Sequence, residues 1–141
     1  MKPITTLLIV LFITLLSSPS WSDELPIGDL VLRDDLYYKK FTNVPFTGEV
    51  TGQWNGKIKN GRKDGSWESY WEDGKLKSNI VFKDGKKDGL FEFYHKNGQL
   101  SEQVKYKREK IDGIWHFFDK DGFLKWTTTY KNGQFLQKVT Y

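Results

Sequence analysis

The sequence predicts an all-β protein, an antiparallel meander of stacked β-hairpins that forms one elongated, twisted single sheet. Three observations support this: short segments recur every 24 residues, Asn-Gly and Asp-Gly pairs punctuate the segments, and apolar residues alternate with polar ones between the pairs. Asn-Gly and Asp-Gly suit two-residue type I′ turns, which need positive φ at both central positions. Alternation is the pattern of strands with one apolar side, and a regular period of this length indicates a repeat architecture.

Glycine, aromatic and leucine positions carry the 24-residue period. Each unit has a glycine after an aspartate, then two aromatic positions, then a leucine after the second turn pair. The equivalent positions are Gly65, Gly89 and Gly113; Trp67, Phe91 and Trp115; Tyr70, Tyr94 and Phe118; and Leu76, Leu100 and Leu124. With two-residue turns throughout, the predicted strands are 46–59, 62–72, 75–83, 86–96, 99–107, 110–120, 123–131 and 134–141.

The predicted register places nearly all large apolar side chains on one face, and mostly Lys, Glu, Asp, Thr and Gln on the other. It sets Trp54 opposite Trp67, Trp67 opposite Ile80, Leu76 opposite Phe93, and Trp126 opposite both Phe117 and Val139. The glycines inside the strands predict bulges or close approaches. Arg108-Glu109 replaces a glycine-containing pair, so a longer or different turn is expected there.

The apolar face needs a cover, because large contiguous apolar surface is uncommon on soluble monomers. Three covers are alternatives: coiling of the sheet on itself, residues 27–45 folding over the face, or a partner chain. The first two make the aromatic residues structural, and the third makes them a binding site.

The first 22 residues predict a signal peptide. Lys2 supplies a positive n-region, residues 7–16 form an apolar run, and Ser20 and Ser22 are the small residues expected before a cleavage site. The run is too short to span a bilayer comfortably, although an uncleaved anchor is the alternative. We therefore expect cleavage near Ser22 and a periplasmic or secreted protein. Residues 23–45 would then be an N-terminal segment with one extra hairpin around Asp34-Asp35, and 46–141 the repeat domain.

Composition and motifs argue against several function classes. The 22 basic and 18 acidic residues are interspersed, without the basic stripe of a nucleic-acid-binding protein. The chain has no cysteine and only two histidines, His95 and His116, which we interpret as structural or surface residues. It has no nucleophile elbow and no phosphate-binding glycine motif. We therefore expect no enzyme, no metal and no cofactor.

The repeated elements at 61–76, 85–100 and 109–124 resemble bacterial MORN repeats, specifically the variant type found in antitoxin-like proteins. Phe46-Thr47-Gly48 is similar to the usual start of that family. The resemblance implies an elongated, twisted sheet of stacked hairpins and a role as a protein-interaction or lipid-associated module. Some bacterial relatives are antitoxins, but an antitoxin normally meets its toxin in the cytoplasm, so the export signal counts against carrying that role over directly.

Aromatic residues are the candidate binding surface. On the polar face the register sets Lys77 across from Tyr70, Lys75 across from Tyr94 and Lys125 across from Phe118. Lysine stems shielding the sheet and a repeated platform for a sugar or a polypeptide are the two interpretations. The full candidate set is Trp54, Trp67, Trp71, Trp115, Trp126, Tyr70, Tyr94 and Phe118.

The expected function is that of a non-enzymatic exported module that binds another protein through its aromatic surface or a free sheet edge. The alternatives are a cell-envelope module that binds glycan or lipid headgroups, and an immunity or antitoxin-like protein. A second copy of the chain is a further partner to consider, as a homodimer.

Overall fold

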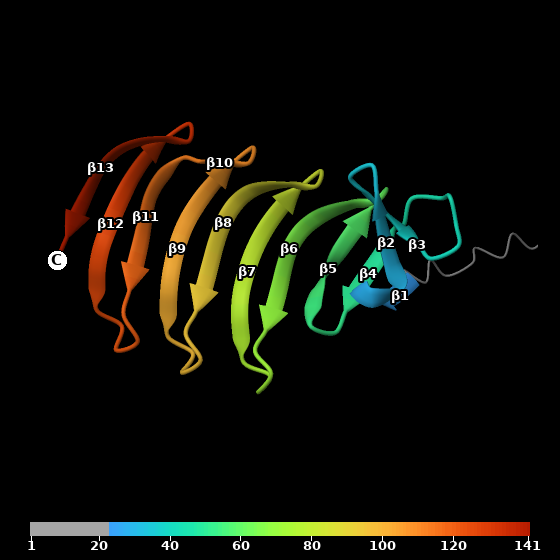
Figure 1. Ribbon diagram of the computed structural model, residues 1–141, viewed down its shortest axis with the longest axis horizontal. Coiled ribbons are helices and arrows are strands. Elements are labelled where there is room, and N and C mark those ends of the chain that lie inside the picture. The colour runs from blue at the N-terminus through green and yellow to red at the C-terminus, as the bar shows by residue number, and fades with distance from the viewer. Residues whose placement is uncertain (1–22) are drawn as a thin grey trace, which may run out of the picture.

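Residues 23–141 form one long open β-sheet with a small hairpin at its N-terminal end, as the computed structural model shows (Figure 1). The signal peptide expected over 1–22 lies outside the described residues. The large sheet has the strand order β1-β4-β5-β6-β7-β8-β9-β11-β12-β13, with β10 also pairing with β9. Every pairing in it is antiparallel except that of β1 with β4. The predicted antiparallel meander is confirmed.

The strands of the large sheet are short and follow one another along the chain. They are β1 (Asp23–Pro26), β4 (Gly48–Thr51), β5 (Trp54–Lys59), β6 (Arg62–Tyr70), β7 (Leu76–Lys83), β8 (Lys86–Tyr94), β9 (Leu100–Lys107), β10 (Lys110–Ile111), β11 (Gly113–Phe118), β12 (Leu124–Lys131) and β13 (Gln134–Thr140). A 3₁₀ turn, η1 (Ile27–Asp29), leads into the separate hairpin of β2 (Leu30–Arg33) and β3 (Leu36–Lys39). No helix among residues 23–141 is long and apolar enough to cross a membrane.

The single strand predicted over 46–59 is wrong, because the chain reverses at Gly52 and forms the hairpin β4–β5. Gly48 lies opposite Ile58, and Val50 opposite Gly56. Gly52 has φ +107°, a conformation that residues with a Cβ rarely adopt. The sequence numbers of residues that pair across this reversal differ by an even number. The alternation of apolar and polar residues therefore continues from β4 into β5 without a break. The pattern therefore could not reveal the turn.

Four turns in the repeat region have two residues, including the one at Arg108-Glu109, where a longer or different turn was expected. Arg108 and Glu109 have φ values of 49° and 69°, close to those of the Asn-Gly turn at 132–133. Glu109 N–H donates to the carbonyl of Lys87 at 2.9 Å, and the neighbouring turns make the equivalent bond at 85 and 133. These bonds between stacked turns hold the geometry without a glycine, so the expectation of a different turn was wrong.

The turns at the opposite ends of the strands, which join β6 to β7, β8 to β9 and β11 to β12, are longer than two residues. Trp71 N–H donates to the carbonyl of Lys75, and Tyr70 pairs with Leu76, which leaves Lys77 as an extra residue in a bulge. The same shift recurs one and two repeats later. The two-residue turns assumed at 73–74, 97–98 and 121–122 are therefore wrong.

Bulges occur at the strand-interior glycines, as predicted, and they change the register. Between Gly56 and Lys57 the β5–β6 register shifts by two, because Gly65 and Ser66 are extra residues on β6. Trp67 therefore lies opposite Gly56 and not opposite Trp54. The equivalent shift between β7 and β8 sets Phe93 opposite Ser78 and not opposite Leu76.

A shift of two leaves the side chains beyond it on their predicted face. The β6–β7 and β11–β12 pairings keep the predicted register up to the bulge beside their turn, so the pairs Trp67–Ile80 and Phe117–Trp126 are confirmed. The β12–β13 register shifts by only one, where Gln137 stands in place of the repeat glycine. Val139 consequently lies opposite Thr127, on the other face from Trp126, so the predicted Trp126–Val139 pair is wrong.

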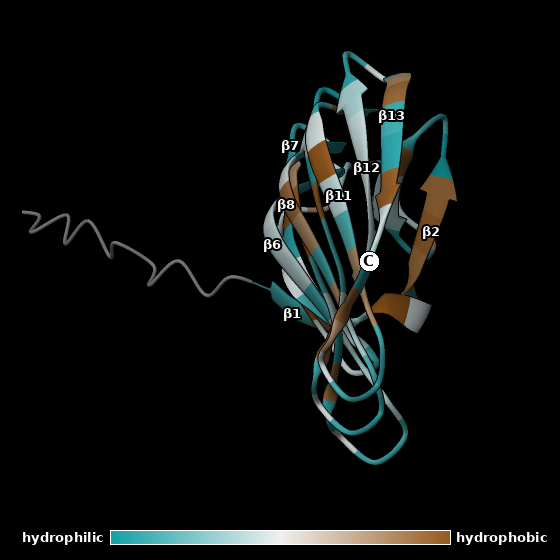
Figure 2. Ribbon diagram, turned by 90° about the vertical axis from the view of Figure 1, so that its left-hand side faces the viewer, coloured by the Kyte–Doolittle hydropathy of each residue, from teal (hydrophilic) through white to brown (hydrophobic). Residues whose placement is uncertain are grey.

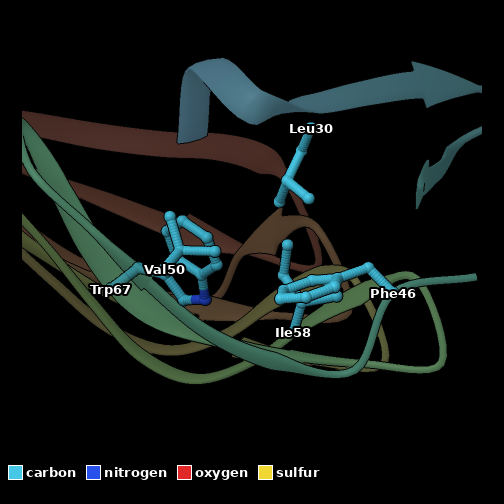
Figure 3. Packing of buried hydrophobic residues seen from close by; sticks show 5 residues of the cluster. All are labelled: Leu30, Phe46, Val50, Ile58 and Trp67. Carbon is cyan, nitrogen blue, oxygen red and sulfur yellow. The ribbon is translucent and has the colours of Figure 1, made fainter. Parts of the chain in front are cut away.

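The hairpin β2–β3 covers the N-terminal end of the apolar face (Figure 2). Figure 3 shows Leu30 of β2 above the side chains of Phe46, Val50, Ile58 and Trp67, and these five residues form the buried core cluster. Hydrogen bonds from Tyr37 N–H to the carbonyl of Gly61 and from Phe46 N–H to the carbonyl of Tyr37 fasten the hairpin. Of the three covers considered, the N-terminal segment is present at this end, whereas the sheet does not coil on itself.

Candidate functional site

Beyond the hairpin, the apolar side of the sheet is a surface of packed rings, which we call the aromatic face. Its rings come from β8 to β12, and each is intermediate in exposure, neither buried nor fully exposed. They belong to Phe91, Phe93, Tyr106, Trp115, Phe117, Trp126 and Tyr130. They shield aliphatic side chains beneath them, because Ile80 and Val104 are only 8% and 2% exposed.

Ring-to-ring contacts hold the aromatic face in place. The rings of Phe117 and Trp126 stack with centroids 5.0 Å apart, and Trp115 meets Trp126 at an angle of 64° with centroids 5.8 Å apart. Phe91 and Tyr106 make an edge contact at 6.3 Å. Each such pair contributes about 0.5–1.5 kcal/mol beyond area burial. These contacts within the chain therefore fix the positions of the rings.

Lysine amines lie over several rings on this side of the sheet. The Nζ atom of Lys87 is 5.1 Å from the ring centroid of Tyr106, and that of Lys138 is 4.8 Å from the ring centroid of Trp126. Glu102 is an acidic residue of this face, and its carboxylate accepts a hydrogen bond from Trp115 Nε1 at 3.2 Å. The surface is thus both aromatic and cationic.

Lys63 has the most enclosed of these amines. Its Nζ lies 4.3–5.9 Å from the ring centroids of Trp67, Phe82, Trp54 and Tyr37. Burial lowers the pKa of Lys63, and repulsion from Lys87 lowers it further. Lys63 lines a cavity of about 250 Å³ between the hairpin and the sheet, whose other lining residues are Leu32, Asp35, Tyr37, Gly61, Arg62, Phe82 and Gly85.

The opposite face carries the recurring tyrosines, whose hydroxyls bind carboxylates and not lysines. Tyr70 donates to Glu68, and Tyr94 donates to Glu92 at 3.1 Å. The hydrogen bond to Glu68 is the main cause of the raised pKa of Tyr70, whereas burial is the main cause of the raised pKa of Tyr94. This face therefore carries two tyrosine–carboxylate pairs, one in each of two neighbouring repeats.

The lysine neighbours predicted for these aromatics are wrong. The amine of Lys77 lies over Trp71, and that of Lys75 donates to the carbonyl of Lys96. The bulges cause the difference, because they set leucines across from the recurring aromatics: Leu76 from Tyr70, Leu100 from Tyr94 and Leu124 from Phe118.

The eight predicted surface residues do not converge on one place. Trp115 and Trp126 belong to the aromatic face, whereas Tyr70, Tyr94 and Phe118 are on the opposite face.

The other three predicted residues have different surroundings. Trp67 is fully buried beneath the hairpin, where it is core, and Trp54 packs against the same cluster. Trp71 lies in the turn between β6 and β7 and contacts the aromatic face, because its ring meets that of Phe93 edge-on with centroids 5.8 Å apart. Its Nε1 donates to the carbonyl of Tyr94 at 3.3 Å.

Sequence reasoning left two lysines out of the candidate set, although a signal for them exists. Lys63 and Lys87 are 24 residues apart and occupy the same repeat position. Lys63 lies opposite Ile58 and Lys87 opposite Phe82, so both side chains project from the apolar side. A recurring lysine at an apolar strand position was therefore visible in the pattern.

The two histidines have separate local environments. His95 Nε2 lies 3.0 Å from the carbonyl of Phe118, the same contact that Trp71 makes one repeat earlier. Because a carbonyl only accepts hydrogen bonds, His95 Nε2 carries the proton. The resulting hydrogen bond links two adjacent repeats. The ring of His116 stacks on Phe118 with centroids 6.2 Å apart. Within residues 23–141, no three His, Cys, Asp or Glu side chains gather in a way that could hold a metal ion.

Comparison with known proteins identifies the repeats. The family described as MORN repeat variant matches residues 63–84 and 87–108. No curated protein and no solved structure matches the chain. Each matched segment covers one hairpin of the meander. The first runs from β6 into the turn after β7, and the second from β8 into the turn after β9. These two segments of the chain are therefore MORN-type repeats.

Proposed function

We propose that this chain is a non-enzymatic, exported repeat module that binds another protein through its aromatic face. The observation that carries the proposal is the run of rings from β8 to β12, none of which is buried. The hairpin β2–β3 lies at the N-terminal end of the sheet and leaves these strands uncovered (Figures 1 and 2). Contiguous apolar surface on a soluble protein commonly marks an interaction site. The proposal that the protein is exported rests on the signal peptide that the sequence predicts over residues 1–22.

The packing of the rings favours tight binding. Phe117, Trp126 and Trp115 are already fixed by mutual contacts. Because these side chains are ordered in the free protein, little conformational entropy is lost when a partner covers them. Aromatic residues are also the type most enriched at the cores of protein interfaces. An immunity role would be one case of such binding.

Envelope binding is the second candidate, and the lysine amines among the rings favour it. Lys63, Lys87 and Lys138 would attract anionic lipid headgroups as readily as they attract carboxylates of a protein. The test of the proposed function must therefore separate protein adducts from lipid or glycan adducts.

Site-specific photocrosslinking in the cell envelope tests the proposal. A benzophenone amino acid at Phe117 places the probe on the aromatic face, and the same probe at Lys105, an exposed residue of the opposite face, is the matched control. We expect a protein adduct of defined mass from position 117 and none from position 105. Equal adducts at both positions, no adduct at 117, or an adduct with lipid or glycan alone would overturn the proposal.

A further inference from the structure

Two lysines interrupt the aromatic face beside the hairpin, and they point to the chemistry of the partner. We propose that the protein segment that docks on the aromatic face is extended and carries carboxylates flanked by apolar side chains, with Lys63 and Lys87 receiving the carboxylates. This inference rests on the proposed function and specifies the partner that the face would bind.

Neither lysine has an ion-pair partner among the described residues. Three carboxylates belong to the surroundings. Asp35 lines the same cavity as Lys63, Glu109 accepts a hydrogen bond from the backbone N–H of Lys87, and Glu102 accepts one from Trp115 Nε1. None of the three lies within 4.0 Å of either amine. The two positive charges are therefore left for a ligand to neutralise.

The enclosure of Lys63 makes a carboxylate at this place favourable. Burial and the charge of Lys87 both disfavour the protonated amine, as its lowered pKa shows. The four surrounding rings attract the cation but bring no negative charge to offset that repulsion. A carboxylate placed between the two amines would offset the repulsion and would form charge-assisted hydrogen bonds.

The shape of this end of the molecule favours an extended segment over a flat membrane. The hairpin β2–β3 projects from one side of the sheet (Figure 2), and this is the side that carries the rings, because Leu30 of the hairpin packs in one cluster with Trp67. Lys63 lies beside the hairpin, in the cavity lined by Leu32 and Tyr37. Packed sheet layers are roughly 10 Å apart, so the hairpin forms a step of that order. A planar bilayer resting on the step would stay away from Lys63, whereas a single polypeptide strand can lie beside the step.

Selection from a random peptide display library tests the inference, with residues 23–141 as the target. The test variant is Lys63→Met/Lys87→Met, because methionine keeps an unbranched apolar stem and removes the charge. The matched control is Lys57→Met/Lys105→Met, which makes the same change of net charge at exposed positions of the opposite face. Circular dichroism verifies that each variant folds, and Lys87→Met alone serves if the double variant does not.

We expect selected peptides rich in Asp and Glu next to aromatic or aliphatic residues. Their affinity should fall at least about tenfold for Lys63→Met/Lys87→Met, or about threefold for Lys87→Met alone, and stay unchanged for the control. Neutral or basic peptides, equal affinity for the test variant, or no selected peptides would overturn the inference.

Phosphatidylglycerol vesicles form the second arm of the experiment. Vesicle binding that depends on Lys63 and Lys87, without selected acidic peptides, would assign the surface to a membrane and overturn the inference. Failure of this inference is distinguishable from failure of the proposed function. A protein adduct at position 117 together with peptides that lack acidic residues overturns the partner chemistry alone.

Discussion

The substitution Gly56→Ala tests the central packing contact of the core. Gly56 lies opposite Trp67, whose indole is fully buried. A Cβ at position 56 would sit 2.5–2.7 Å from three atoms of that indole. The φ of Gly56 is outside the left-handed region, so the substitution introduces a steric clash without backbone strain.

The cost follows from what the indole can do in response. It cannot move freely, because Trp67 Nε1 donates to the carbonyl of Lys57 at 3.1 Å and the hairpin packs above it. Overpacking costs about 1–3 kcal/mol, and loss of this partly buried hydrogen bond adds about 0.5–1.5 kcal/mol. We therefore expect Gly56→Ala to lower the free energy of unfolding by about 1.5–4.5 kcal/mol.

Urea unfolding followed by circular dichroism measures this change. Gly28→Ala is the matched control, because a Cβ at position 28 would meet nothing within 4 Å and its φ is also outside the left-handed region. The control should change the free energy of unfolding by less than about 0.5 kcal/mol. A Gly56→Ala protein as stable as the unsubstituted chain would refute the packing of Trp67 beneath the hairpin.

Three further predictions concern stability and ionisation. Arg108→Asn should raise the free energy of unfolding, measured by urea denaturation, by about 0.5–1 kcal/mol, because asparagine tolerates the positive φ of this position better than arginine does. An unchanged free energy of unfolding would contradict the turn geometry. Ser69→Ala should cost about 1–3 kcal/mol by leaving its buried partner Ser78 unpaired, and the double Ala variant should cost less than the single one. The raised pKa of Tyr70 gives stability that is present below pH 10.0 and lost as the pH rises through the folded-state pKa. Glu68→Gln should lower this pKa in a tyrosinate absorbance titration, and an unchanged pKa would sink that account.

The fold class follows from features that a single sequence displays. The period and the turn pairs predict the meander, and alternation predicts which side is apolar. Register does not follow, because Gly65 and Lys77 are extra residues in bulges, and a bulge leaves the period intact. The turn at 108–109 escaped prediction for another reason, since its geometry is held by hydrogen bonds from the neighbouring repeat.

The candidate site was predictable only in part. Trp115 and Trp126 follow from alternation, whereas the burial of Trp67 depends on how the hairpin β2–β3 docks. That docking joins segments distant in the sequence, and no local pattern specifies it. The role of Lys63 likewise depends on Tyr37, which reaches it only through the folded hairpin.

Binding of an uncharged hydrophobic dye to the folded protein, with its mass measured by light scattering, tests the open aromatic face most directly. Energy transfer from tryptophan to the dye reports binding, and weaker transfer in a Trp115→Phe/Trp126→Phe variant places the dye near these two residues, which pack together on that face. We predict a folded monomer of residues 23–141 that binds the dye, and loss of that binding when Phe117 becomes Ser. A folded monomer that binds no dye would contradict the account, because the aromatic face would then be covered by the chain itself.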